Sequence, residues 1–469
     1  MNKNGWWKLF LVIVVPIAIW FSPTPSGLEV KAWHMFAIYA GAMLGIILRP
    51  FPEPVIVLLA VAVAGLLFNS PKLALAGFGN STVWLVFSAF LLSQAFIDTG
   101  LGKRISYVLL KYFGKSTLGV GYVAAVTDLI ISPATPSNTA RSGGVVYPIF
   151  RSLAATLGSE PGPTGRKIGS YLTILMYQIS LTTGTLFLTA MAPNALVASF
   201  AAKILHVDLN WGVWAMAAAV PGLLILFALP WLVYKVYPPE IRQVSDSARI
   251  AQSGLAELGA MKWQEMALAV LFILAIVAWA TTQVTGIDAT MIAVAFVALC
   301  LVLGVTKWDS VLTSGGAWST LIWYGGIVGL ASALSDAKFF EWLADVLGRS
   351  LGLAGWNHVL VLLFLLVLSL VVRYLFASTA AYVASFIPVL YSMALSANVS
   401  PMVAALLIAF SSGFGSLLTH YGGALGPVLF GTGYVDQATW WKIGIIVVAF
   451  SSLVYLVIGM PYWRLVGLW

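Results

Sequence analysis

Charged residues, cysteines and histidines are all scarce in this chain. Only 9% of the 469 residues are Asp, Glu, Lys or Arg, whereas soluble domains carry about 25%. The single cysteine, Cys300, excludes a disulfide framework and a metal site built from cysteines. The four histidines lie far apart, and no zinc-protease or serine-hydrolase motif occurs. We therefore expect no catalytic residues, no resident metal and no cofactor.

Hydrophobic residues make up 61% of the chain and form runs too long for the strands of a membrane barrel. This pattern predicts an all-α polytopic membrane protein that lies in a lipid bilayer. The net charge of +8 is scattered over short polar segments, so no nucleic acid partner is expected. We predict eleven transmembrane spans near residues 6–22, 33–49, 53–69, 82–98, 168–205, 211–235, 264–285, 288–306, 316–335, 402–431 and 440–463.

A polar stretch rich in Gly and Pro, residues 132–144, lies between two apolar segments. The apolar flanks, 119–131 and 145–150, are each shorter than the about 20 residues that cross a bilayer. Two short helices that meet at a polar tip predict a re-entrant hairpin at about residues 118–150. A kinked helix packed through its Ser and Thr side chains is the alternative interpretation.

A second polar interruption predicts another hairpin at about residues 357–395. When Thr139 is aligned with Thr379, Pro148 falls on Pro388. Interrupted apolar segments at matching positions in two halves are typical of the substrate site of a secondary transporter. The sequence therefore predicts a carrier with one hairpin in each half.

The longest polar stretch, 238–262, is predicted to connect a first half, 1–237, to a second half, 263–469. With the N-terminus in the cytoplasm, most Lys and Arg residues fall on the cytoplasmic side. This orientation brings the first hairpin in from the cytoplasm and the second from outside, as an inverted repeat requires. The basic start lacks a cleavage pattern, so we expect a retained first helix in a bacterial inner (plasma) membrane.

The tips of the two predicted hairpins carry related motifs, Ser-Asn-Thr at 137–139 and Ala-Ser-Thr at 377–379. This pair resembles the divalent anion:sodium symporter (DASS) family over nearly the whole chain. The form Pro-Ser-Asn-Thr-Ala-Arg-Ser-Gly-Gly at 136–144 is similar to the family's exchanger branch. That branch includes plastid 2-oxoglutarate/malate translocators and bacterial citrate/succinate and tartrate/succinate antiporters. The resemblance implies a homodimeric carrier of di- or tricarboxylates.

In that family the two tips bind the substrate carboxylates, and a broken helix faces each tip. The candidates for these breaks here are Thr183-Gly184-Thr185 and Gly422-Gly423-Ala424. Carried over to this chain, the resemblance implies nine substrate-binding residues: Ser137, Asn138, Thr139, Ser378, Thr379, Gly184, Thr185, Gly423 and Ala424. The second tip has no Asn, which leaves its partner residue open. Short hydroxyls and helix N-termini bind carboxylates without adding a full charge.

A bound dicarboxylate brings about two negative charges into the membrane, and an unpaired buried charge costs several kcal/mol. Symporters of the family use sodium ions beside each tip. Here Arg141 follows the first tip, and Pro133 stands where the sodium-coupled branch tends to have a Ser ligand. Our hypothesis is that Arg141, together with His420 when it is protonated, replaces sodium as a fixed cation.

Other roles stay open for these charged residues. Arg141 is alternatively a side chain that reaches the membrane interface, and His420 a packing histidine. Arg373 is predicted either to contact the substrate or to cap the second hairpin. Asp98 and Asp128 are candidate partners for either arginine.

Fixed cations favour exchange, because an empty carrier would take bare positive charge through the membrane. We therefore predict sodium-independent antiport by alternating access. The alternative is sodium-coupled dicarboxylate symport. An intramembrane enzyme lacks the paired acid/base or metal cluster that it needs, and a channel does not require an inverted hairpin pair.

Overall fold

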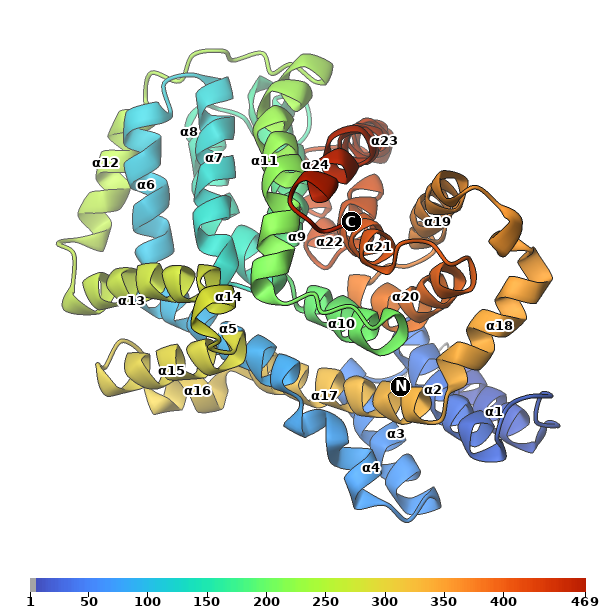
Figure 1. Cartoon of the computed structure of the whole chain (residues 1–469). Coiled ribbons are helices and arrows are strands. Elements are labelled where there is room, and N and C mark those ends of the chain that lie inside the picture. The colour runs from blue at the N-terminus through green and yellow to red at the C-terminus, as the bar shows by residue number, and fades with distance from the viewer. Residues whose placement is uncertain (1–5) are drawn as a thin grey trace.

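The computed structural model describes residues 6–469, which are helical apart from loops and an isolated β-bridge between Ser116 and Gln243 (Figure 1). Residues 1–5, which the sequence places in the cytoplasm, lie outside the described part. The helices of the first half are α1 (Trp6–Phe21), α2 (Val30–Leu48), α3 (Glu53–Leu67), α4 (Pro71–Leu75), α5 (Ser81–Thr99), α6 (Leu101–Phe113), α7 (Thr117–Ile131), α8 (Tyr147–Thr156), α9 (Gly169–Leu186), α10 (Ala192–Phe200), α11 (Trp211–Val236) and α12 (Ser247–Leu258).

The second half repeats much of this order. Its helices are α13 (Trp263–Ala280), α14 (Thr282–Thr285), α15 (Ala289–Val302), α16 (Trp308–Thr313), α17 (Gly315–Asp336), α18 (Phe339–Leu351), α19 (His358–Arg373), α20 (Thr379–Ser396), α21 (Pro401–Phe414), α22 (Leu425–Phe430), α23 (Gln437–Val454) and α24 (Met460–Leu465). Within residues 6–469, nine helices are long and apolar enough to cross a membrane, and shorter apolar helices accompany them. The prediction of an all-α polytopic membrane protein is confirmed.

The lengths of two hairpin helices differ from the prediction. The helical segment 117–134 and α20 each have 18 residues, enough by length and composition to cross a membrane. The predicted flank 119–131 was too short because helical backbone continues through the turn at Ser132–Ala134. Helix α20 runs without interruption from Thr379 to Ser396 although Pro388 lies inside it. Each hairpin is nevertheless two helices joined by a short tip, and its re-entrant course stays a prediction.

The helices form two layers (Figure 1). One layer contains α1–α5 and α13–α17, in which α17 packs against α3 and α5, and α15 packs against α5. The other layer contains α7–α11 and α19–α24, in which α9 packs against α7, α11 and α21. Helix α10 contacts α5 and α17 of the first layer as well as α20 of its own. Both hairpins therefore lie in the same layer.

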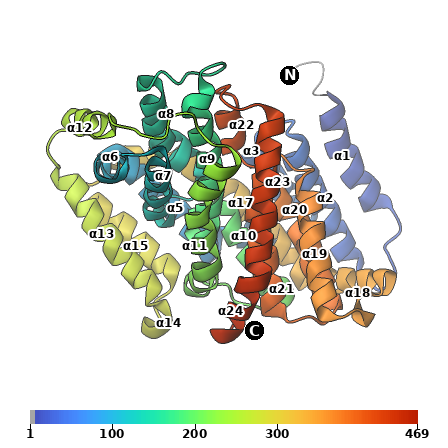
Figure 2. The same ribbon diagram turned by 90° about the horizontal axis from the view of Figure 1, so that it is seen from above.

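An amphipathic helix precedes each hairpin. Helix α6 precedes the first hairpin and packs against α12, which begins after the loop that leaves α11. Helix α18 precedes the second and buries Phe339, Phe340 and Ala344. Figure 2 shows α12 and α18 at opposite edges of the molecule, the arrangement expected if the hairpins enter from opposite sides. The division of the chain at 238–262 stays a prediction.

Gly77 lies at a close backbone contact within the first layer. It belongs to a short 3-10 helix, Ala76–Gly79, against α17, and a Cβ atom there would lie 1.9 Å from the Gly325 carbonyl oxygen. Because that neighbour is backbone, it cannot rotate away. Gly77→Ala is therefore expected to destabilise the protein by about 1–3 kcal/mol or more, measured as a lower melting temperature in detergent.

The neighbouring Gly79 provides the control, because a Cβ atom there would meet nothing within 4 Å. Gly79→Ala should leave the melting temperature close to that of the unmodified protein. Equal melting temperatures for the two variants would contradict the close packing at Gly77.

Candidate functional site

Two prolines end the helix that leads into the first tip, and a serine caps the helix that leaves it. Helix α7 passes into the turn Ser132–Ala134, and Pro133 and Pro136 disfavour further helix. Helical backbone resumes at Thr139, where the hydroxyl of Ser137 accepts a hydrogen bond from the backbone N–H of Ala140 at 3.2 Å. The N-terminus of the second helix of the hairpin thus begins at the Ser-Asn-Thr motif.

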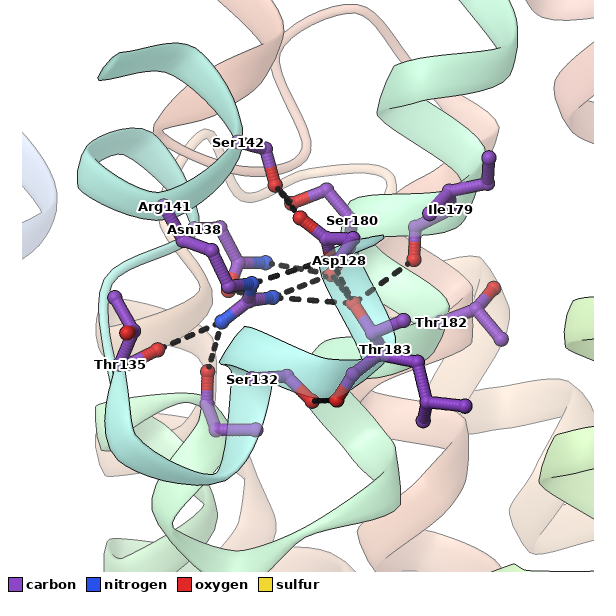
Figure 3. Close-up of polar contacts among 12 residues, drawn as sticks. Asp128, Ser132, Thr135, Asn138, Arg141, Ser142, Ile179, Ser180, Thr182 and Thr183 are labelled. Atoms are coloured by element: carbon purple, nitrogen blue, oxygen red, sulfur yellow. Dashed lines mark hydrogen bonds and ion pairs between the residues drawn. The ribbon is translucent and has the colours of Figure 1, made fainter. Parts of the chain in front are cut away.

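Arg141 lies behind this tip, fully buried (Figure 3). Its Nε atom donates to Asp128 Oδ2 at 3.1 Å, and neither side chain is exposed. The other N–H groups lie within 3.1 Å of four acceptors, the carbonyl oxygens of Thr135, Ser180 and Ala190 and the hydroxyl of Thr183. A guanidinium has five N–H groups, so all of them have protein acceptors.

Asp128 balances the charge of Arg141. Its carboxylate also accepts hydrogen bonds from Ser142, at 2.6 Å, and from Thr183 on α9. Because the pair is formally neutral, Arg141 is not the uncompensated cation that the sequence predicted. It does not reach the membrane interface either, since it is completely buried. The other candidate partner, Asp98, bonds with Gln94 and Thr306 instead.

The predicted substrate residues of the first tip lie against α9. Asn138 Nδ2 donates to the Ser180 carbonyl at 3.3 Å, and its Oδ1 accepts from Arg141 at 3.4 Å. A Cβ atom on Gly184 would lie 3.2 Å from Asn138 Nδ2, so glycine allows this close approach. Ser137 and Thr139 are partly buried beside Asn138.

The break in the facing helix comes later than predicted. Helix α9 continues through Gly184 and Thr185 to Leu186, and the regular helix is lost at 187–191. Thr185 donates to the Thr182 carbonyl at 2.8 Å, a bond that is compatible with helical backbone. The predicted break at Thr183–Thr185 is therefore wrong, because this Thr-Gly-Thr sequence forms the last turn of a helix.

The second tip is organised around Arg373. Helix α19 ends at this residue, and α20 starts with Ser378 as its cap, whose hydroxyl accepts from Ala381 N at 3.3 Å. Arg373 donates from Nε to Ser416 Oγ at 3.1 Å and from Nη2 to Thr379 Oγ1 at 2.9 Å. It also donates to the carbonyl oxygens of Phe376 and Gly422, and its guanidinium lies 5.3 Å from the centre of the Tyr382 ring.

Arg373 is 1% exposed, and no acidic side chain in the described range 6–469 forms an ion pair with it. It contacts both the tip residue Thr379 and Gly422 of the facing break, and its contact with a substrate stays a prediction. It joins the hairpin to the break rather than capping an exposed end. The sequence signal was present, since an intramembrane Arg stands six residues before Thr379.

The chain is non-helical at 419–424, beside the second tip, and this stretch includes the predicted break at 422–424. His420 stands in it, and its Nδ1 atom accepts a hydrogen bond from Trp441 Nε1 at 3.1 Å. Because an accepting nitrogen carries no proton, this arrangement does not fit a protonated His420. Gly423 is buried and Ala424 is exposed.

Helix α9 links the two tips, which share no direct hydrogen bond within the described part of the chain. The hydroxyl of Tyr177 lies 2.8 Å from the Ser416 carbonyl and 2.9 Å from the Thr419 carbonyl, and it donates to both. A Cβ atom on Gly413 of α21 would lie 2.0 Å from Thr185 Cγ2, so these helices pack closely. The structure thus brings each predicted tip against its facing helix and joins the two through α9.

Comparison with known proteins gives full-length matches. The family described as "Sodium:sulfate symporter transmembrane region" matches residues 3–469. Inner membrane protein YbhI of Escherichia coli is 44% identical over 476 residues, covering 100% of this chain and 99% of its own. The putative malate transporter YflS of Bacillus subtilis is 42% identical, covering 98% of this chain and 96% of its own.

A more distant relative is the L-tartrate/succinate antiporter of Shigella sonnei, which is 33% identical and covers 97% of this chain and 96% of its own. Among solved structures, the Alcanivorax borkumensis YdaH transporter superimposes with a TM-score of 0.58 at 13% identity, covering 99% of this chain and 98% of its own. At this identity the structural match shows the fold alone.

Proposed function

The chain belongs to the divalent anion:sodium symporter family, a family of membrane transporters, and from this premise we propose that it exchanges di- or tricarboxylates across the membrane without sodium. The putative malate transporter and the L-tartrate/succinate antiporter to which it is similar support this substrate class. Malate, succinate, 2-oxoglutarate and citrate are the acids that we would test first.

In this proposal one carboxylate contacts Ser137, Asn138 and Thr139, and the other contacts Ser378 and Thr379. Backbone and small side chains of the facing helices complete the site, at Gly184, Thr185, Gly423 and Ala424. The helix N-termini at Thr139 and Thr379 supply partial positive charge for the two carboxylates.

The observation that carries the proposal is the buried charge of Arg373, which lies 2.9 Å from Thr379 Oγ1 and forms no ion pair with an acidic side chain of residues 6–469. This role moves from Arg141 and His420, as the sequence had it, to Arg373. A fixed cation cannot leave with the substrate, so the empty carrier moves with bare positive charge inside a low-dielectric layer. The barrier to that movement favours exchange of one substrate for another over net uptake.

The test uses purified protein in liposomes. The vesicles contain unlabelled succinate, labelled succinate is added outside, and sodium is omitted. Labelled succinate is expected to enter these vesicles at least about tenfold faster than vesicles without internal succinate. A tenfold difference in rate corresponds to about 1.4 kcal/mol of extra barrier for the return of the empty carrier. Protein-free liposomes provide the background. Uptake that needs sodium, or that is equal in empty vesicles, would instead favour sodium-coupled symport.

We also propose that the carrier is a homodimer in a bacterial inner membrane with its N-terminus in the cytoplasm. The similarity to an inner membrane protein of Escherichia coli supports the location. Mass measurement of the detergent-solubilised particle tests the dimer, and cysteine labelling from either side tests the orientation.

A further inference from the structure

The two halves of the proposed site carry different net charges. We define the first half-site as the tip 137–139 with Arg141 and Asp128, and the second as Ser378 and Thr379 with Arg373. In the first, a buried arginine faces a buried aspartate at 3.1 Å. In the second, a buried arginine has no acidic partner among residues 6–469. The first half-site is thus formally neutral and the second carries one positive charge.

The two arginines also differ in how many N–H groups they have left for a ligand. All five N–H groups of Arg141 have protein acceptors, so it has none left for a ligand. In Arg373, Nη1 has two N–H groups but a single acceptor in the described structure, the Phe376 carbonyl at 2.8 Å. One N–H on Nη1 therefore has no acceptor in the described residues and can donate to an anion, while Nη2 donates to Thr379.

The chemistry of each half-site selects what it binds. A guanidinium offers donors and no acceptor, and its charge favours an ionised carboxylate over a neutral amide. The hydroxyl of Ser137 and the amide of Asn138 contain both donor and acceptor atoms, so they can pair with a carboxylate or with an amide. Because the Arg141–Asp128 pair has no net charge, the first half-site lacks the full positive charge by which the second favours a carboxylate over an amide.

We propose that the carrier requires an ionised carboxylate only at the second half-site and accepts any short polar group that forms hydrogen bonds at the first. This inference rests on the proposed function and defines its substrate class more closely. The substrates are small acids with one obligatory carboxylate and a second polar end, which is a carboxylate in a dicarboxylate and an amide in its monoamide.

The test compares three ligands of the same length in unmodified protein. Succinate, succinamate (its monoamide) and succinamide (its diamide) compete with labelled succinate during exchange in liposomes loaded with succinate. The inhibitory concentration of succinamate is expected to be within about tenfold of that of succinate, because its amide loses at most one hydrogen bond at the neutral first half-site. Succinamide is expected to be at least about 100-fold weaker, because it leaves the buried guanidinium without an anion.

The variant Arg373→Lys conserves the positive charge, so succinate, succinamate and succinamide should inhibit it in the same order of strength. If this variant does not fold, the comparison of the three ligands in the unmodified protein decides the inference. If succinamate is as weak as succinamide, both half-sites require a carboxylate and the inference is overturned, although continued exchange of succinate leaves the proposed function intact. If labelled succinate, malate, 2-oxoglutarate and citrate are not exchanged at all, the proposed function fails and the inference fails with it.

Discussion

Replacement of Arg373 by Gln is expected to slow dicarboxylate exchange by about 100-fold, since truncating one partner of a desolvated charge pair costs about 2–5 kcal/mol. The side chain is buried, reaches Thr379 Oγ1 at 2.9 Å and has no acidic partner in residues 6–469. In the variant, a bound carboxylate would be buried without the charge that stabilises it. Initial rates of labelled succinate exchange in liposomes, at equal amounts of inserted protein, measure the loss.

Two further variants separate charge from folding. Arg349→Gln removes a guanidinium that is 79% exposed and pairs with Asp345 on α18, so exchange should stay within about twofold of the unmodified rate. Arg373→Lys keeps the positive charge but loses the planar guanidinium with its five N–H donors, so it should retain part of the exchange activity. Full exchange by a well-folded Arg373→Gln protein would show that another group balances the substrate.

Asp128→Asn is expected to lower the stability of the protein by about 3–5 kcal/mol, because it leaves the Arg141 guanidinium buried without its counterion. The pair is completely buried, and the carboxylate also receives hydrogen bonds from Ser142 and Thr183. The loss should appear as a lower melting temperature in detergent and as reduced folded protein in the membrane.

The double variant Asp128→Asn/Arg141→Gln removes both charges and should recover part of the stability, which a double-mutant cycle would measure. Asp246→Asn is the matched control, because its pair with Arg249 is exposed at 44% and 72% and contributes about 0–1 kcal/mol. If Asp128→Asn is as stable as Asp246→Asn, Arg141 does not depend on Asp128 for its charge balance.

The order of helices could be read from the sequence because apolar runs and polar interruptions report directly on burial. The structure has non-helical backbone at 135–137 and 374–378, at or next to the predicted tips 137–139 and 377–379, and at 419–424, which includes the predicted break 422–424. The break after α9 was placed too early, because Thr and Gly are read as helix breakers whereas Thr185 bonds back to the Thr182 carbonyl within the helix.

The charge assignment could not be read from the sequence in the same way. Both intramembrane arginines were visible, but their partners depend on how each hairpin folds back. Arg141 and Asp128 are 13 residues apart and meet only because the chain reverses through Pro133 and Pro136. The sequence does not show that Arg141 has an acidic partner whereas Arg373 has none among residues 6–469, because both arginines stand in similar polar interruptions.

In the proposed exchanger, the charge of Arg373 also makes transport sensitive to the membrane voltage. One elementary charge that crosses the whole field is worth about 2.3 kcal/mol per 100 mV. In a cell that is negative inside, the voltage therefore draws the empty site, with its single positive charge, toward the cytoplasm. A bound dianion gives the loaded site a net charge of minus one, so the voltage draws it outward. When one dianion is exchanged for another, the same charge moves in each direction, and the full exchange cycle carries no net current.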